Sequence, residues 1–145
     1  MPQMLKVEIT GSDKFIKAAK AYAKKQSRDL NAILGEAAIE TQGEAQRSIL
    51  SHQSKGAIYE KRNGVTHQAS LEGYPPNSDT GTLVKNITIE TIKGGYEVGS
   101  RKGAPWGAWL EFGTSRVGAR PWLQPAYDKI VGKMMDRFKK ELGKV

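Results

Sequence analysis

The chain has 145 residues, no cysteine and a formal net charge of +8, with 23 Lys and Arg against 15 Asp and Glu. This is the length of one domain with a core of its own, and the lack of cysteine excludes disulfides, thiolate metal sites and a cysteine nucleophile. No stretch is apolar over the roughly 18 residues of a membrane span, and the first residues have no apolar secretory signal, so we expect a soluble, unexported chain whose charge favours acidic partners.

The first predicted elements are a short strand and a long helix. Residues 5–10 alternate apolar and polar side chains, which is the period of a strand with one buried face. Gly11 ends this strand, and Ser12 or Asp13 can cap the amides of a helix that reaches about Ile49. We therefore expect a strand followed directly by a helix.

The second half of that helix carries a continuous apolar stripe. Its members recur at steps of three and four residues, as on a helix face that packs against a core: Leu30, Ile33, Leu34, Ala37, Ala38, Thr41, Ala45 and Ile49. Gly35 and Gly43 each lower helix stability by roughly 1 kcal/mol relative to alanine, which allows a kink or a break. Glu36, Glu40 and Glu44 share another face, which we interpret as a solvated acidic surface rather than a pair of acid–base catalysts.

Residues 51–80 are rich in glycine and proline and contain few large apolar side chains, so we place them outside the core. A connection of this length without secondary structure is usually a functional loop or a disordered segment. A third interpretation is an extended hairpin arm, in which Asn63-Gly64 forms a type I′ turn between residues 57–62 and 65–70. All three remain open at this point.

The pattern returns to that of strands over residues 83–100, which alternate and turn at Gly94-Gly95. This is the clearest hairpin in the sequence. Residues 106–112 then predict a short helix, which Gly113 ends by adopting a left-handed cap conformation.

The last element is a helix from Pro125, which fits the first helical position, to about Leu142. Its apolar stripe consists of Ala126, Tyr127, Ile130, Val131, Met134, Phe138 and Leu142. Helices and hairpins are segregated along the chain, which indicates an α+β fold: an antiparallel sheet of hairpins packed against a long N-terminal helix and a C-terminal helix. We expect a single domain over residues 1–145, with a flexible loop or hairpin arm at 51–80.

No set of residues indicates catalysis. The two histidines, His52 and His67, fall in the 51–80 segment without the spacing of metal ligands, and a zinc site needs three or four convergent ligands. Serines lie near His52, but nothing marks an orienting acid or an oxyanion hole. The glycines also do not form a phosphate loop. We therefore expect no catalytic residue, no metal and no cofactor.

Positive charge gathers on one face of the first half of the long helix, at Lys17, Lys20, Lys24 and Arg28. Such a face can lie against phosphates, with an affinity that falls as salt rises. No aromatic stacking platform or base-reading motif accompanies it, so an ordinary solvated face is the favoured interpretation. A basic nucleic-acid-binding module is the alternative function.

The segment 104–126 contains all three tryptophans, Trp106, Trp109 and Trp122, together with Phe112. Aromatic residues this dense form either a core plug or a subunit interface, and the residues alone do not separate the two. The segment's only acidic residue, Glu111, lies near Arg116 and Arg120 in sequence, so we expect a charge-assisted pair across the loop.

Two strings in this part of the chain are motifs. LEFGTSRVGARPWLQPAY (110–127) resembles the E-F-G-T…A-R-P-[FW]-L-x-P-A signature of the small head–tail joining proteins of tailed bacteriophages and prophages, also called neck, tail-completion or minor tail proteins. DTGTLVKNITIE (79–90) resembles the T-G-x-L-x-x-S-I element of the same family, with Asn86 where serine is common. The order of elements over residues 12–142 is similar as well, although the 51–80 segment is longer than in shorter members.

The resemblance implies a non-enzymatic protein of the phage neck. Such a protein forms or joins a homo-oligomeric ring between the portal-side connector or head-completion protein and the tail tube or tail terminator protein, with non-specific contact to passing DNA. It would assemble in the host cytoplasm and reside in the virion. The positions carried over, as assembly or motif residues, are Gly81, Leu83, Glu111, Phe112, Gly113, Thr114, Ala119, Arg120, Pro121 and Trp122.

Overall fold

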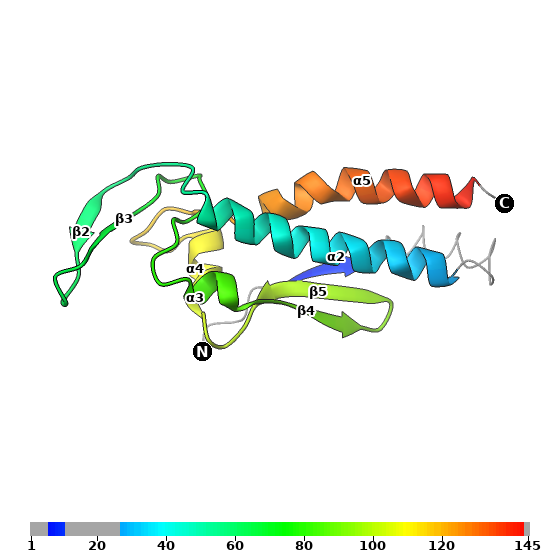
Figure 1. Ribbon diagram of the computed structural model, residues 1–145, viewed down its shortest axis with the longest axis horizontal. Helices are drawn as coiled ribbons and strands as arrows, with labels where there is room; N and C mark the ends of the chain where they lie inside the picture. Colours follow the sequence, from blue (N-terminus) through cyan, green and yellow to red (C-terminus); the bar gives the residue numbers. More distant parts are fainter. Residues whose placement is uncertain (1–5, 11–26, 144–145) are drawn as a thin grey trace.

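A computed structural model describes residues 6–10 and 27–143. Its elements in chain order are β1 (Lys6–Thr10), α2 (Ser27–Leu50), β2 (Ile58–Glu60), β3 (Thr66–Gln68), α3 (Thr82–Lys85), β4 (Ile87–Ile92), β5 (Gly95–Ser100), α4 (Trp106–Phe112) and α5 (Gln124–Leu142). Figure 1 shows α2 and α5 side by side in opposite directions, the sheet on the other side of α2, and the β2–β3 hairpin projecting beyond the helix ends. The α+β architecture with its antiparallel sheets is confirmed.

The long helix α2 is continuous through both internal glycines, so the break allowed there is absent. A β-carbon on Gly35 would lie 3.2 Å from the Tyr96 hydroxyl oxygen, so the missing side chain makes room for that ring. The predicted stripe is confirmed, since it is buried from Ile33 to Ile49 and half-buried at Leu30. The predicted first half of this helix lies outside the described residues.

The C-terminal helix α5 begins one residue before the predicted start, which leaves Pro125 in its first turn. Ala126, Ile130, Met134 and Phe138 are buried at steps of four residues, as the periodicity predicted. These side chains face α2, so α2 is covered by α5 on one side and by the sheet on another. Within the described residues, no helix is long and apolar enough to cross a membrane.

The acidic stripe of α2 is exposed at Glu36, as expected, but it also faces basic residues of α5 and is largely covered at Glu44. Lys129 Nζ lies 2.6 Å from Glu44 Oε1, and Arg137 lies 2.7 Å from Glu40 and 3.4 Å from Glu36. The hydrogen bond from Lys129 is the main cause that lowers the pKa of Glu44. The spacing of the three glutamates shows that they share one face of the helix, but it does not show that α5 packs beside that face.

The three-stranded sheet has the order β1-β5-β4, antiparallel throughout. Val98 lies between Val7 and Ile89 in the register, and Gly94 turns the β4–β5 hairpin with a φ of 83°. The predicted strand from residue 83 is wrong at its start, because residues 82–85 form the single helical turn α3.

Asn86 accounts for that turn. Its Nδ2 donates to the Thr82 carbonyl at 2.8 Å, and its own N–H bonds the Thr82 and Leu83 carbonyls. The carbonyls at the end of the turn are therefore satisfied locally. The strand begins only at Ile87.

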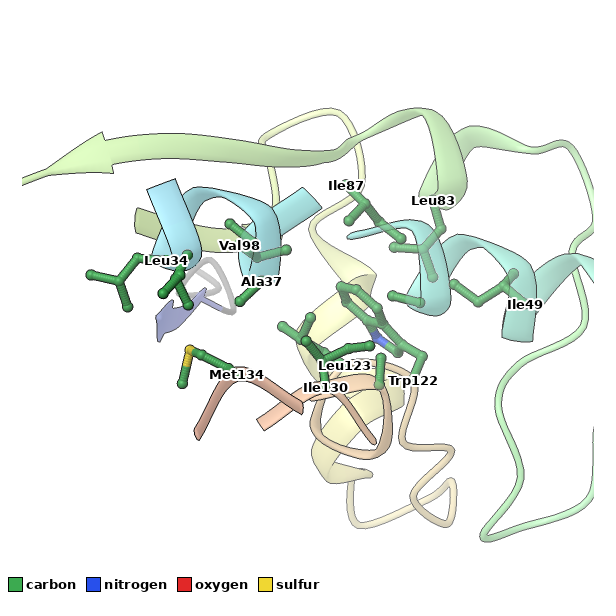
Figure 2. Packing of buried hydrophobic residues seen from close by; sticks show 14 of the residues in the cluster. Leu34, Ala37, Ile49, Leu83, Ile87, Val98, Trp122, Leu123, Ile130 and Met134 are labelled. Atoms are coloured by element: carbon green, nitrogen blue, oxygen red, sulfur yellow. The ribbon is translucent and has the colours of Figure 1, made fainter. Parts of the chain in front are cut away.

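The core lies where α2, the sheet and the start of α5 meet. Figure 2 shows Trp122 and Leu123, both fully buried, reaching from the start of α5 into the cluster that includes Ile87 and Val98. At this depth each large apolar side chain contributes roughly 1.5–3 kcal/mol. The two residues directly before α5 are thus part of the core.

Segment 51–80 contains an antiparallel hairpin, β2–β3, which we call the arm. The expected type I′ turn is wrong. In a type I′ turn both central residues have positive φ, yet Asn63 is not among the described residues with positive φ, and only Gly64 has one, at 78°. Gly64 N–H donates to Lys61 O and Lys61 N–H to Val65 O, the pattern of a three-residue loop closed by a left-handed glycine.

Candidate assembly interface

The carboxylate of Glu111 caps the N-terminus of α5. Its Oε2 accepts the backbone N–H groups of Trp122 at 2.7 Å and Leu123 at 2.9 Å, and its Oε1 accepts that of Gln124 at 2.9 Å. The first amides of a helix have no partner within the helix, and a negative charge is favoured there. Glu111, only 7% exposed, therefore fixes α4 to the start of α5.

The expected pair between Glu111 and an arginine is wrong. No ion pair among the described residues involves Glu111, whose oxygens bond to backbone amides instead. Arg120 Nε donates to Ser70 O at 3.1 Å, and its Nη1 donates to Gly118 O at 3.0 Å. Arg120 thus ties the loop before α5 to the base of the arm.

The four aromatic residues of segment 104–126 divide between the two roles that we left open. Trp122 is fully buried, and its Nε1 donates to the Gly107 carbonyl at 2.9 Å, so it is the core plug. Trp106, Trp109 and Phe112 are 36%, 50% and 71% exposed. These three side chains of α4, which we call the aromatic surface, leave apolar area for a partner.

The loop after α4 is shaped by Gly113 and Thr114. Gly113 has the positive φ that we predicted, 75°, but with an extended ψ of 174° rather than a left-handed one. A β-carbon there would lie 2.8 Å from the Ala119 nitrogen, so no larger residue fits. Thr114 N–H donates to Val117 O, and its hydroxyl accepts the N–H groups of Arg116 and Val117. The loop is therefore a compact turn.

A cleft of about 500 Å³ lies between the arm, residues 76–82 and α4. Its apolar lining includes Ile49, Tyr59, Leu83, Trp106, Leu110 and Val117. Gly81, the residue before α3, and Arg120 also line the cleft. Ala119 and Pro121, the sequence neighbours of Arg120, are half-buried. The structure thus places Gly81, Leu83 and Arg120 of the predicted set at one cleft, whereas Glu111 and Trp122 are buried and do not line it.

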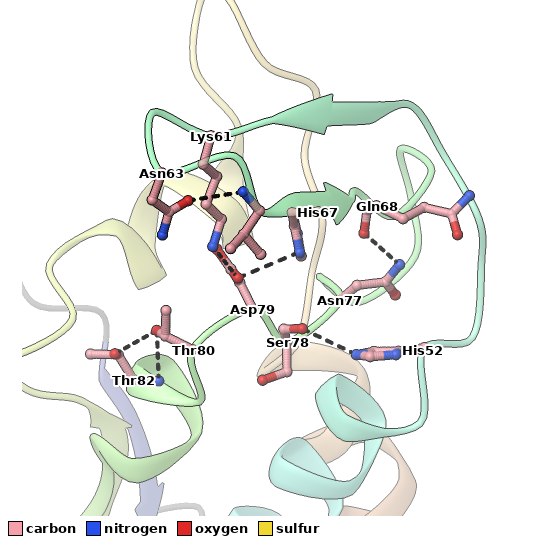
Figure 3. A network of polar contacts seen from close by, with 11 residues as sticks. His52, Lys61, Asn63, His67, Gln68, Asn77, Ser78, Asp79, Thr80 and Thr82 are labelled. Carbon is pink, nitrogen blue, oxygen red and sulfur yellow. Dashed lines mark hydrogen bonds and ion pairs between the residues drawn. The ribbon is translucent and has the colours of Figure 1, made fainter.

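A polar network holds the arm over the cleft (Figure 3). Asp79 forms an ion pair with Lys61, and its Oδ1 lies 3.8 Å from His67 Nδ1. Asn77 Nδ2 donates to Gln68 O at 3.1 Å and so covers the outward carbonyl at the end of β3. The arm is therefore positioned mainly by polar contacts.

Both histidines lie in this region. His52 Nε2 is 3.2 Å from Ser78 O, and the His67 ring meets Tyr59 edge-to-face with centroids 5.4 Å apart. Among residues 6–10 and 27–143, no group of three or more His, Cys, Asp or Glu side chains is arranged to hold a metal ion.

Of the predicted basic face, Lys17, Lys20 and Lys24 lie outside the described residues, and Arg28 is exposed at the start of α2. The sequence analysis missed Ser70, Asn77 and Gly107. Ser70 and Gly107 accept hydrogen bonds through their backbone carbonyls, and Asn77 donates to backbone carbonyls through its side-chain amide. Contacts of this kind leave no spacing pattern in the sequence.

One protein-family model matches the chain. It is described as "Bacteriophage HK97-gp10, putative tail-component" and covers residues 13–113. The match includes the T-G-x-L element and ends within the E-F-G-T string, so the A-R-P half of that motif lies beyond it. Comparisons with curated proteins and with solved structures found no match.

Proposed function

Since the chain belongs to the HK97-gp10-like family of phage tail components, we propose that it is a non-enzymatic neck protein that forms or joins a ring between the head and the tail tube. Its neighbours on the two sides would be a connector or head-completion protein and a tail tube or tail terminator protein. It would assemble in the host cytoplasm and remain in the virion.

The observation that carries the proposal is the aromatic surface beside the cleft. Half-exposed tryptophans are typical of contacts with other proteins, since they combine a large apolar area with one polar group. The body already buries Trp122, so these side chains are not needed for its core. Exposed apolar side chains that gather at one end of the chain support the proposal that this end binds another protein.

A head-to-tail contact between copies would produce a ring. When one patch of a subunit binds a different patch of an identical subunit, the contact repeats and closes if the rotation permits. The arm end and the opposite end of the body are different surfaces of one chain (Figure 1). A head-to-tail contact between copies is therefore the simplest route to a ring.

The test is an in vitro joining assay. Phage particles made without this chain should accumulate filled heads and finished tails that remain apart, and the purified chain should restore joined, infectious particles. The same assay with Phe112→Ser should fail, whereas Ile39→Ser, which alters an equally exposed apolar residue on α2, should succeed. Joined particles in the absence of the chain would overturn the proposal.

A salt titration addresses the alternative function. A nucleic-acid-binding module would bind duplex DNA with submicromolar affinity and a steep loss of affinity as salt rises. For a neck protein, we expect weak binding that is lost at physiological salt. Tight, salt-dependent binding combined with normal joining by the variants would favour the alternative.

A further inference from the structure

One backbone edge of the arm has no hydrogen-bond partner among the residues that the structure describes. Lys61 N–H donates to Val65 O next to the hairpin loop, and such bonds alternate along an antiparallel pair. Tyr59 therefore bonds to β3, whereas the N–H and C=O groups of Ile58 and Glu60 turn away from it. We call these outward groups the arm edge.

The two sides of the arm differ. On the other side, Asn77 Nδ2 reaches the outward carbonyl of Gln68 in β3. All three residues of β2 are exposed, with Ile58 at 67% and Tyr59 at 51%. An exposed apolar edge strand is a template for pairing with another strand, so the arm edge is a surface that needs a partner.

Within the described part of the chain, the three-stranded sheet also has an open edge at β4. Arg101 N–H donates to Asn86 O, so the same alternation turns Ile89 and Thr91 away from β5. We call their outward groups the sheet edge. Nearer the start of β4 the edge is covered, because Gln42 Nε2 donates to the outward carbonyl of residue 87 at 2.7 Å.

The two edges match in length. Each presents two outward residues separated by one inward residue, so an antiparallel pairing places Ile58 opposite Thr91 and Glu60 opposite Ile89. Both would be hydrogen-bonded pairs, which exchange two bonds each. Within one chain the contact is not made, because the arm projects away from the end of the sheet (Figure 1).

We propose that the arm edge of one copy pairs with the sheet edge of a second copy, so that β2 becomes a fourth strand of the neighbour's sheet. Strand addition of this kind obtains affinity from main-chain hydrogen bonds. Because the two edges differ, the contact is head-to-tail and repeats around a ring. The inference rests on the proposed self-assembly and names the surfaces that perform it.

Two proline substitutions test the pairing. Proline has no N–H and is tolerated on an edge strand where that N–H faces outward. Glu60→Pro blocks the arm edge and Thr91→Pro blocks the sheet edge, while neither removes a bond to β3 or β5. Glu60→Ala and Thr91→Ala are the matched controls, because they change the same side chains but keep the N–H.

The readout is the mass of the purified full-length chain by native mass spectrometry, with circular dichroism to verify folding. We expect each proline variant alone to lose the oligomer and the alanine variants to keep it. A mixture of the two proline variants should form a dimer with one copy of each, because the Glu60→Pro copy retains its sheet edge and the Thr91→Pro copy its arm edge. That dimer also shows that both variants are folded.

Other results overturn the inference. If wild type assembles and the proline variants do so equally, the edges are not the contact, although the proposed function stands. Loss with Glu60→Pro but not with Thr91→Pro would indicate arm-to-arm pairing or the edge of β1. Loss in the alanine variants would indicate a side-chain contact instead. A wild type that stays monomeric removes the self-assembly on which the inference rests.

Discussion

The helical body of the chain and its arm end are stabilised by different interactions. In the body, apolar side chains from α2, β5 and α5 are sealed from solvent, with Ala38 and Val98 at 0% exposure and Phe138 at 2%. At the arm end, the ion pair of Asp79 and the hydrogen bonds of Arg120 position a hairpin whose first strand is wholly exposed.

In the function that we propose, this difference would separate folding from assembly. Burial of apolar surface drives folding of the body, whereas an isolated two-stranded hairpin is marginally stable in water. Polar contacts hold the arm in place, and the apolar side chains of β2 and α4 stay exposed. In the proposed function, these exposed side chains contact other subunits. Substitutions in the body should therefore reduce stability, and substitutions at the arm end should reduce assembly.

The largest loss of stability is expected for Trp122→Ala. This removes a fully buried indole and leaves the Gly107 carbonyl without its donor, which should cost about 3–5 kcal/mol of the free energy of unfolding. Trp109→Ala is the matched control, since the same side chain is half exposed there and its loss should cost less than about 1 kcal/mol. Urea denaturation measures both, and equal losses would contradict the division between plug and surface.

Glu111→Ala should follow, with a cost of about 3 kcal/mol, because three amides at the start of α5 lose a buried, charged acceptor. Glu111→Gln keeps one acceptor oxygen and should cost less. Asp136→Ala, at an exposed position of α5, should change stability by no more than about 0.5 kcal/mol. Denaturation midpoints that do not separate Glu111→Ala from Asp136→Ala would refute the capping role.

Arg120→Ala acts at the junction of the two regions. It removes the bonds to the Ser70 and Gly118 carbonyls, and we expect a global loss of only about 1 kcal/mol. The larger effect should be local, as faster hydrogen exchange of the arm amides measured by NMR. Arg116→Ala is the control, since that side chain is exposed in the same loop. Unchanged arm exchange in Arg120→Ala would contradict the tie between loop and arm.

Glu44→Gln tests the charged seam between α2 and α5. The pKa of Glu44 is lowered in the folded chain, chiefly by the hydrogen bond from Lys129. Its contribution is therefore present above the ordinary glutamate pKa and disappears as the pH falls through the folded value. We expect the variant to lose less than about 1 kcal/mol at neutral pH and nothing at low pH. The same loss at both pH values would exclude this linkage.

The smallest effect on stability is expected for Phe112→Ser, no more than about 0.5 kcal/mol, since this side chain is 71% exposed. Its effect on assembly should be large, as loss of the oligomer in sedimentation velocity. Ile39→Ser, 63% exposed on α2, is the matched body control and should keep the oligomer. If Ile39→Ser also dissociates it, the assembly surface extends over the body.

The sequence predicted the elements whose apolar residues recur with a regular period. The alternation of residues 5–10 and the stripes of the two long helices record which sides are buried, and the structure confirms them where it describes them. The single turn at 82–85 is too short to show a period, so it was taken for strand. At the arm loop, Asn63-Gly64 suits both a two-residue type I′ turn and a three-residue loop that ends in a left-handed glycine. The register between β2 and β3 decides between these two loops.

The candidate site was harder to predict than the fold. The motif residues were located, but their partners were not, because Glu111 bonds to backbone amides and Arg120 to a carbonyl of the distant arm. Every residue carries such groups, so charge pattern favoured an ion pair between Glu111 and an arginine instead. Exposure also depends on packing, which is why Trp122 and Trp109 could not be told apart from sequence.

The central claim is that the arm end joins identical subunits into a ring. Native mass spectrometry of the wild-type chain over a range of concentrations tests it most directly. We expect one discrete homo-oligomer of fixed size that replaces the monomer as concentration rises. A monomer at every concentration, or a ladder of ever larger masses without a preferred size, would contradict it.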